Sequence, residues 1–147
     1  MVWAVAERAP SESVEGRGIV RASWLATAAL AASDFAAALG PKRLLVPGAI
    51  VAVVLFLGGC GVFIGAWVVA AQRSREDLVD LAGLFFLTGT APRSVRRHLL
   101  GSTIAQSVIA VTCATLRPAA AAGILAPVSG LALGALWSAR HGRFPRR

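Results

Sequence analysis

A long uncharged segment runs from Leu44 to Ala71, and no other feature of the chain limits its possible folds as strongly. A helix from Pro47 to Ala71 would be about 37 Å long at 1.5 Å per residue, and proline suits the first turn of a helix. Such a helix crosses a hydrocarbon core of roughly 30 Å with room for tilt. We therefore predict a membrane span over about residues 47–71.

Two further uncharged segments, residues 99–116 and 119–139, lie in the C-terminal part of the chain. The first is just long enough to span a bilayer, and the second contains Pro127, for which we predict a kink. Arg117 and Pro118 leave room only for a short turn between the two segments, so we expect them to run antiparallel.

Residues 72–98 form a basic loop between the first and second of these spans. Within the loop, residues 81–92 are uncharged but too few to cross a bilayer, which favours a short interfacial helix. Thr88, Gly89 and Pro92 would end that helix.

The composition agrees with a membrane protein. The 147 residues are 56% hydrophobic and 15% charged, with a mean hydropathy of +0.70. A soluble domain of this size needs more polar residues to cover its surface. The predicted fold class is therefore an all-α integral membrane protein whose membrane domain covers residues 44–147.

Residues 1–43 are predicted to be a polar N-terminal tail that contains one Ala-rich helix at 22–39. Leu25, Phe35 and Leu39 recur at helical spacing, but Asp34 interrupts the segment. A carboxylate at mid-bilayer costs about 2.5–3.5 kcal/mol on insertion scales, so we favour an amphipathic helix and three spans. A fourth span at residues 22–39 is the alternative.

The net charge of +8 comes mainly from the loop 72–98 and the tail 140–147. Cytoplasmic loops of membrane proteins are rich in Lys and Arg, so we expect a cytoplasmic C-terminus in a bacterial cell membrane. The N-terminus is outside with three spans and inside with four. Since topology and anionic headgroups account for the charge, nucleic acid is not an expected partner.

Small and polar residues at four-residue spacing are candidates for helix packing, because small residues let backbones approach closely in lipid. Gln106 lies near the middle of its predicted span, where its amide should bond to a neighbouring helix. The candidates are Gly61, Gly65, Ser102, Gln106, Ala126, Gly130 and Gly134.

Basic residues at the predicted span ends are candidates for binding anionic headgroups, namely Arg93, Arg96, Arg97, Arg140 and Arg143. We find no paired catalytic carboxylates, no nucleophile beside a base, no phosphate loop and no metal-ligand spacing. The chain is therefore predicted to have no catalytic residue, cofactor or metal site.

The segments FFLTGTAPRSVRRHLLG and GLALGALWSARHGRFPRR, together with Gln106, resemble a family of small, uncharacterised actinobacterial multi-pass membrane proteins. The resemblance covers about residues 81–147 and implies membrane helices but no activity. Residues 1–40 lie outside the resemblance. This is expected if they are an extension found in one lineage or if the start site is misassigned.

Three functional hypotheses follow from the sequence. We favour a non-enzymatic accessory or structural subunit of a membrane assembly, whose partner is another membrane protein or a second copy. An oligomeric transporter or channel is the alternative, with Ser102, Gln106, Thr112 and Thr115 as pore residues. A lipid-acting membrane enzyme is the third, and the lack of catalytic groups disfavours it.

Overall fold

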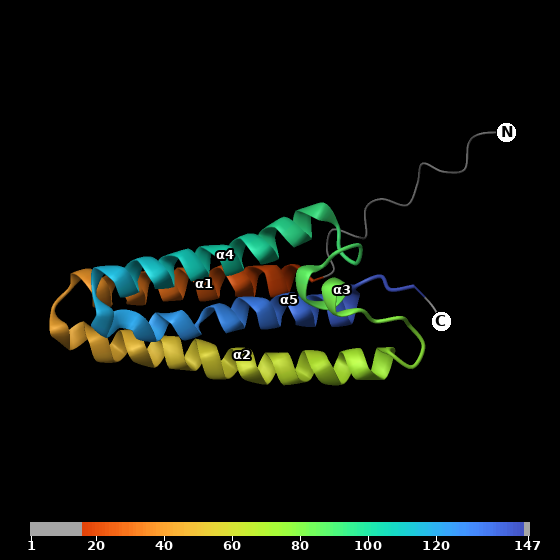
Figure 1. Ribbon diagram of the computed structural model, residues 1–147, viewed down its shortest axis with the longest axis horizontal. Helices are drawn as coiled ribbons and strands as arrows, with labels where there is room; N and C mark the ends of the chain where they lie inside the picture. Colours follow the sequence, from red (N-terminus) through yellow and green to blue (C-terminus); the bar gives the residue numbers. More distant parts are fainter. Residues whose placement is uncertain (1–15, 146–147) are drawn as a thin grey trace.

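The structure is a computed structural model that describes residues 16–145, and these form an all-α bundle (Figure 1). The long helical segments are α1 (Arg17–Leu39), α2 (Leu45–Arg73), α4 (Arg93–Leu116), and η2 (Pro118–Leu125) continued by α5 (Pro127–His141). The single turn η1 (Lys42–Leu44) and the short helix α3 (Leu81–Phe86) lie in the connections. Among the described residues, four helical segments are long and apolar enough to cross a membrane.

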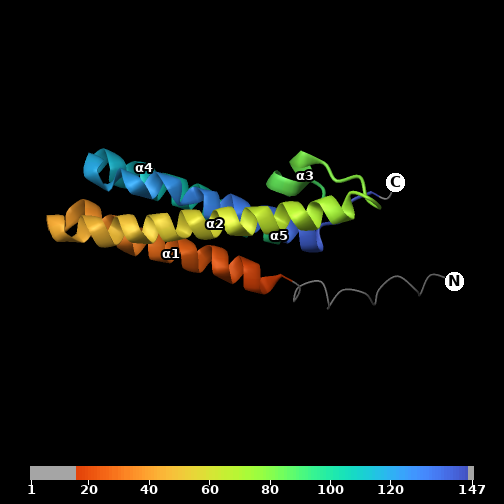
Figure 2. The same cartoon turned by 90° about the horizontal axis from the view of Figure 1, so that it is seen from below.

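Consecutive long helices run in opposite directions, and α1 packs mainly against α4 while α2 packs mainly against α5 (Figures 1 and 2). The starts of α1 and α4 therefore share one end of the bundle with the ends of α2 and α5. The connection 74–92 also lies there, and we call this the loop end. The opposite end, which holds η1 and Arg117, is the turn end.

The helix α1 begins at Arg17, five residues earlier than expected, and packs inside the bundle. Its apolar residues Leu25 and Leu39 are 70% and 72% exposed, whereas Asp34 is buried. This arrangement reverses that of an amphipathic helix on a soluble protein, and it suits a helix that faces lipid on one side. The structure thus fits the four-span alternative.

The other predicted spans agree with the structure except at two places. The span predicted at 47–71 corresponds to α2. The span predicted at 99–116 begins earlier, at Arg93, because Pro92 precedes its first turn and the basic residues continue the helix. Pro127 does not kink a continuous helix; it begins α5 after the 3-10 segment η2.

The short helix predicted within residues 81–92 is confirmed as α3, which is held against α5 by hydrogen bonds. Asp80 caps its start, accepting from the Gly83 amide at 2.9 Å, and Leu87 ends it in the left-handed region. Ser138 of α5 and Thr90 donate to the Gly83 carbonyl at 2.7 and 2.9 Å. These bonds fix the connection 74–92 to the loop end.

We predict that the two ends of the chain lie on the same side of the membrane, because α1 starts and α5 ends at the loop end. Epitope tags before Met1 and after Arg147 should be equally protected from protease in intact spheroplasts. A cysteine at position 42, in a background without Cys60 and Cys113, should label from the opposite side. Tags on opposite sides would show that α1 does not span.

Candidate functional site

Five buried side chains from three helical segments form a polar cluster inside the bundle, namely Ser23, Thr27, Ser102, Gln106 and Ser129. The hydroxyls of Ser23 and Ser102 hydrogen-bond across the α1–α4 contact. Gln106 Nε2 donates to Thr27 Oγ1 at 3.0 Å, and Ser129 Oγ lies 3.4 Å from Gln106 Oε1. The amide of Gln106 therefore connects α1 to α5 through α4, as its predicted role in helix packing requires.

Glycine and alanine at the contacts make room for this cluster. A Cβ atom on Gly130 would lie 2.5 Å from Thr103 Oγ1 and 3.1 Å from Gln106 Oε1. On α2, a Cβ atom on Gly59 would lie 2.8 Å from the Ser129 backbone. Both glycines therefore let two backbones approach more closely than any other residue would allow.

The predicted small-residue candidates divide into two groups. Ala126, Gly130 and Gly134 are buried at contacts within the bundle, and a Cβ atom on Gly134 would lie 3.5 Å from Leu87. Gly61 and Gly65 instead lie on the exposed face of α2, where an added Cβ atom would meet nothing within 4 Å. These two glycines pack no helix within the described chain.

Asp34 lies on the inner face of α1 against η2. It is 1% exposed, its Oδ2 atom has no hydrogen-bond partner among the described residues, and a Cβ atom on Gly123 would overlap its carboxylate. Because α1 ends at Leu39, Asp34 lies roughly 8 Å from the C-terminal end of the helix. It is therefore near the turn end, where a carboxylate costs less than at mid-bilayer.

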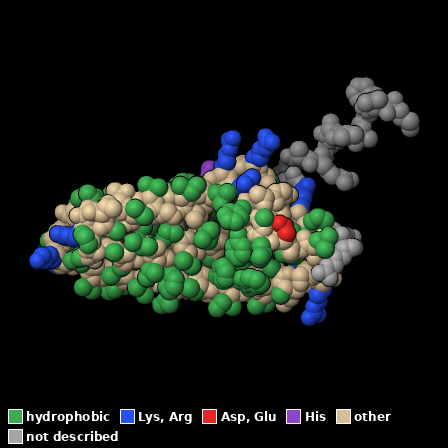
Figure 3. All heavy atoms as spheres, viewed as in Figure 1, with side chains coloured by type: hydrophobic (Ala, Val, Ile, Leu, Met, Phe, Trp, Pro, Cys, Tyr) green, Lys and Arg blue, Asp and Glu red, His purple; other side chains and the backbone are tan. Residues whose placement is uncertain are grey.

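The residues predicted to bind headgroups lie at the loop end, where arginine side chains gather (Figure 3). Arg93, Arg96 and Arg97 are exposed in the first turns of α4. Arg140 is exposed in the last turn of α5, and Arg143 follows that helix. The structure thus brings both predicted groups to one end of the molecule.

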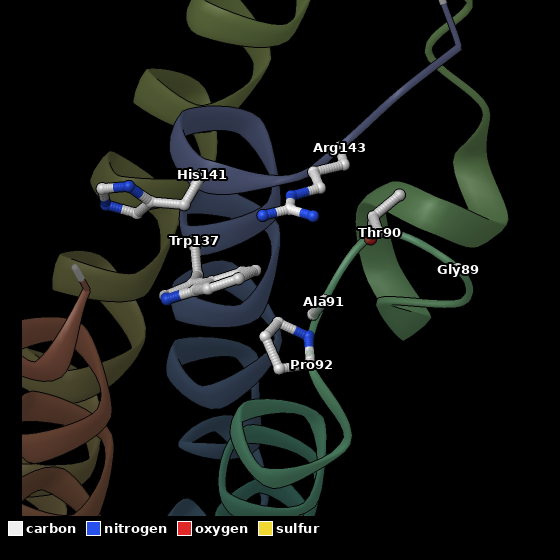
Figure 4. Close-up of a pocket in the computed structure, with 7 residues that line it drawn as sticks. All are labelled: Gly89, Thr90, Ala91, Pro92, Trp137, His141 and Arg143. Atoms are coloured by element: carbon white, nitrogen blue, oxygen red, sulfur yellow. The ribbon is translucent and has the colours of Figure 1, made fainter. Parts of the chain in front are cut away.

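A pocket of about 370 Å³ opens at the loop end between α5 and the turn 89–92 (Figure 4). Trp137 and Pro92 line it, and the Arg143 side chain is directed toward the Trp137 ring. His141 lies beside Trp137, with their ring centroids 5.6 Å apart. Thr90 and His141 also line the pocket, and the Thr90 hydroxyl donates to the Gly83 carbonyl at 2.9 Å.

No group of three or more His, Cys, Asp or Glu side chains within residues 16–145 is placed to hold a metal ion. Both cysteines, Cys60 and Cys113, are free thiols. The proposed pore residues do not share a face, because Ser102 and Gln106 are buried whereas Thr112 and Thr115 are exposed.

Comparison of the chain with protein-family models, curated proteins and solved structures finds no match. The resemblance to small actinobacterial membrane proteins is therefore still a prediction.

We predict that Gln106→Leu destabilises the bundle by about 0.6–2 kcal/mol, because it removes the bond from the amide to Thr27. Reversible unfolding in mixed detergent micelles would measure the change. Ser107→Ala is the matched control, since the Ser107 hydroxyl bonds to the Thr103 carbonyl of its own helix. Equal stability of the two variants would contradict a role for the amide in joining helices.

We also predict that Gly123→Ala destabilises the bundle by about 1–3 kcal/mol, the usual cost of overpacking, because the new methyl group overlaps the Asp34 carboxylate. The double variant Asp34→Ala/Gly123→Ala should lose less than the sum of the single losses. Gly18→Ala, whose new methyl group meets nothing within 4 Å, serves as the control. Additive losses in the same unfolding assay would show that the two sites do not touch.

Proposed function

We propose that the chain is a multi-pass protein of the bacterial cytoplasmic membrane with its loop end in the cytoplasm. The support is the distribution of basic residues, since short cytoplasmic loops are rich in Lys and Arg. The turn end has Lys42, Arg43 and Arg117. The described Arg residues at the loop end are Arg17, Arg21, Arg73, Arg75, Arg93, Arg96, Arg97, Arg140 and Arg143.

Within that membrane, the best-supported function is that of a non-enzymatic accessory or structural subunit. The observation that carries this proposal is that the polar side chains inside the bundle bond to one another between helices. Gln106, Thr27 and Ser23 are buried and bonded to neighbouring helices, so they stabilise the bundle and do not line an open path. A transporter or an enzyme needs polar groups that a substrate can reach.

The outer face of α2 supports a role in docking. This helix is the most apolar of the four candidate spans and the least buried inside the bundle. Gly58, Gly61 and Gly65 recur on that face, with open space where side chains would be. Another membrane helix could approach α2 closely at these glycines.

An oligomeric small transporter or channel is the second candidate, and Asp34 is the observation that favours it. Buried carboxylates in membrane helices often belong to ion or proton pathways, and interrupted helices often line substrate sites. Within residues 16–145 no group hydrogen-bonds to Asp34 Oδ2, and the carboxylate lies against the interrupted segment at Gly123. This candidate requires several copies, because the interior polar side chains Ser23, Thr27 and Gln106 are buried and bonded between the helices of one bundle.

We predict that the tagged protein purifies from its native membrane in mild detergent with one foreign protein in fixed stoichiometry. Gly61→Leu/Gly65→Leu should reduce that co-purification at least tenfold, because two bulky side chains then block the outer face of α2. Native mass analysis of the purified complex would measure both. Thr112→Leu, at an exposed position of α4, is the control for added bulk.

A homogeneous homo-oligomer without a foreign partner would contradict the subunit proposal and favour the transporter or channel. The decisive variant in that case is Asp34→Asn, which keeps the shape of the side chain and removes its charge. Loss of flux with an unchanged oligomer would then assign Asp34 to the pathway.

A further inference from the structure

An apolar groove of about 500 Å³ lies on the outside of the bundle between the first turns of α1 and α4. Its walls are Val20, Trp24 and Leu25 on α1 and His98 on α4, with Arg21 at the rim. It is separate from the polar cluster, from the pocket in Figure 4 and from the exposed face of α2. We propose that this groove is a specific binding site for one anionic phospholipid.

The position of the groove along α1 matches the two parts of a phospholipid, the headgroup and the acyl chains. At 1.5 Å per residue, Arg21 lies roughly 6 Å and Trp24 roughly 10 Å from the start of α1. Charged heads at this depth reach the headgroup layer, while tryptophan rings sit at the boundary with the acyl chains. The groove therefore presents a cation above and an apolar wall below.

The charge at the rim selects an anionic headgroup. Arg21 and His98 are exposed and come from two neighbouring helices. Exposed Arg97 is the residue before His98, and basic side chains gather at this end of the bundle (Figure 3). A phosphodiester accepts hydrogen bonds from a guanidinium and an imidazole, and the choline group of a zwitterionic lipid would be repelled here.

The floor of the groove is held in place by the polar cluster. The hydroxyl bond between Ser23 and Ser102 brings α1 and α4 together directly behind it. The Trp24 ring meets the His98 ring edge-on, with centroids 6.4 Å apart. An added Cβ atom at Gly101, one turn farther along α4, would meet nothing within 4 Å, so space continues there for an acyl chain.

The groove thus has fixed walls, an apolar interior and a positive rim, which distinguishes it from the general basic surface of the loop end. The proposal rests on the proposed membrane location. It does not depend on whether the protein is an accessory subunit or a transporter.

The test is native mass spectrometry of the purified full-length protein titrated in detergent with dioleoyl phosphatidylglycerol or dioleoyl phosphatidylcholine. We expect one tightly bound phosphatidylglycerol per chain and at least about fivefold weaker binding of phosphatidylcholine. Arg21→Gln/His98→Gln should weaken phosphatidylglycerol binding at least about fivefold. The control Arg75→Gln/His141→Gln removes the same two residue types at the same end of the bundle, away from the groove, and should leave binding unchanged.

Equal loss in both double variants would show general attraction to a basic surface and overturn the proposal. Equal binding of the two lipids would overturn it as well, as would equally tight binding of glycerol 3-phosphate, which has no acyl chain. Failure here while a foreign partner co-purifies would leave the proposed subunit function standing.

A second measurement avoids changing the rim. With Trp3, Trp67 and Trp137 replaced by Phe, brominated phosphatidylglycerol diluted into phosphatidylcholine micelles should quench Trp24 fluorescence more than brominated phosphatidylcholine at the same fraction. Equal quenching would show that Trp24 samples bulk lipid only and would overturn the proposal.

Discussion

The contact between α1 and α4, made by buried hydrogen-bonding side chains, is the constraint on which the rest of the structure depends. Ser23 bonds to Ser102, and Thr27 accepts from Gln106, so the two helices run parallel in a fixed register. Lipid offers such groups no partner, which makes mutual satisfaction inside the bundle the only favourable arrangement. The polar face of α1 therefore points inward, while Leu25 and Leu39 point outward.

Several other features follow from that contact. The approach of α5 to Gln106 requires glycine at position 130. The packing of Asp34 of α1 against η2 requires glycine at position 123. At the turn end, the Arg117 guanidinium donates to the carbonyl groups of Ala37 and Gly40 at 2.8 and 2.9 Å. These bonds satisfy carbonyl groups that the end of α1 leaves open, so α1 is fixed at both ends.

The sequence predicted the helical class and the long apolar helices, because uncharged length is a strong signal. It also made Gln106 a candidate for helix packing, since an amide in mid-span needs a partner on a neighbouring helix. It did not predict that α1 joins the bundle. Ser23, Thr27 and Ser129 are common residues, and their pairing depends on which helices are neighbours. The carboxylate of Asp34 argued against a span, because the sequence of α1 does not show that Gly123 of another segment leaves room for that carboxylate inside the bundle.

The most direct test of the account is disulfide formation between cysteines placed at positions 23 and 102 in a chain without Cys60 and Cys113. The hydroxyls of Ser23 and Ser102 are in contact, so the account predicts rapid formation of an intramolecular disulfide when copper phenanthroline is added as oxidant to native membranes. A control pair at positions 25 and 102 should not react, since Leu25 faces outward. No disulfide in the first pair, or equal reaction of both pairs, would contradict a bundle built on the α1–α4 contact.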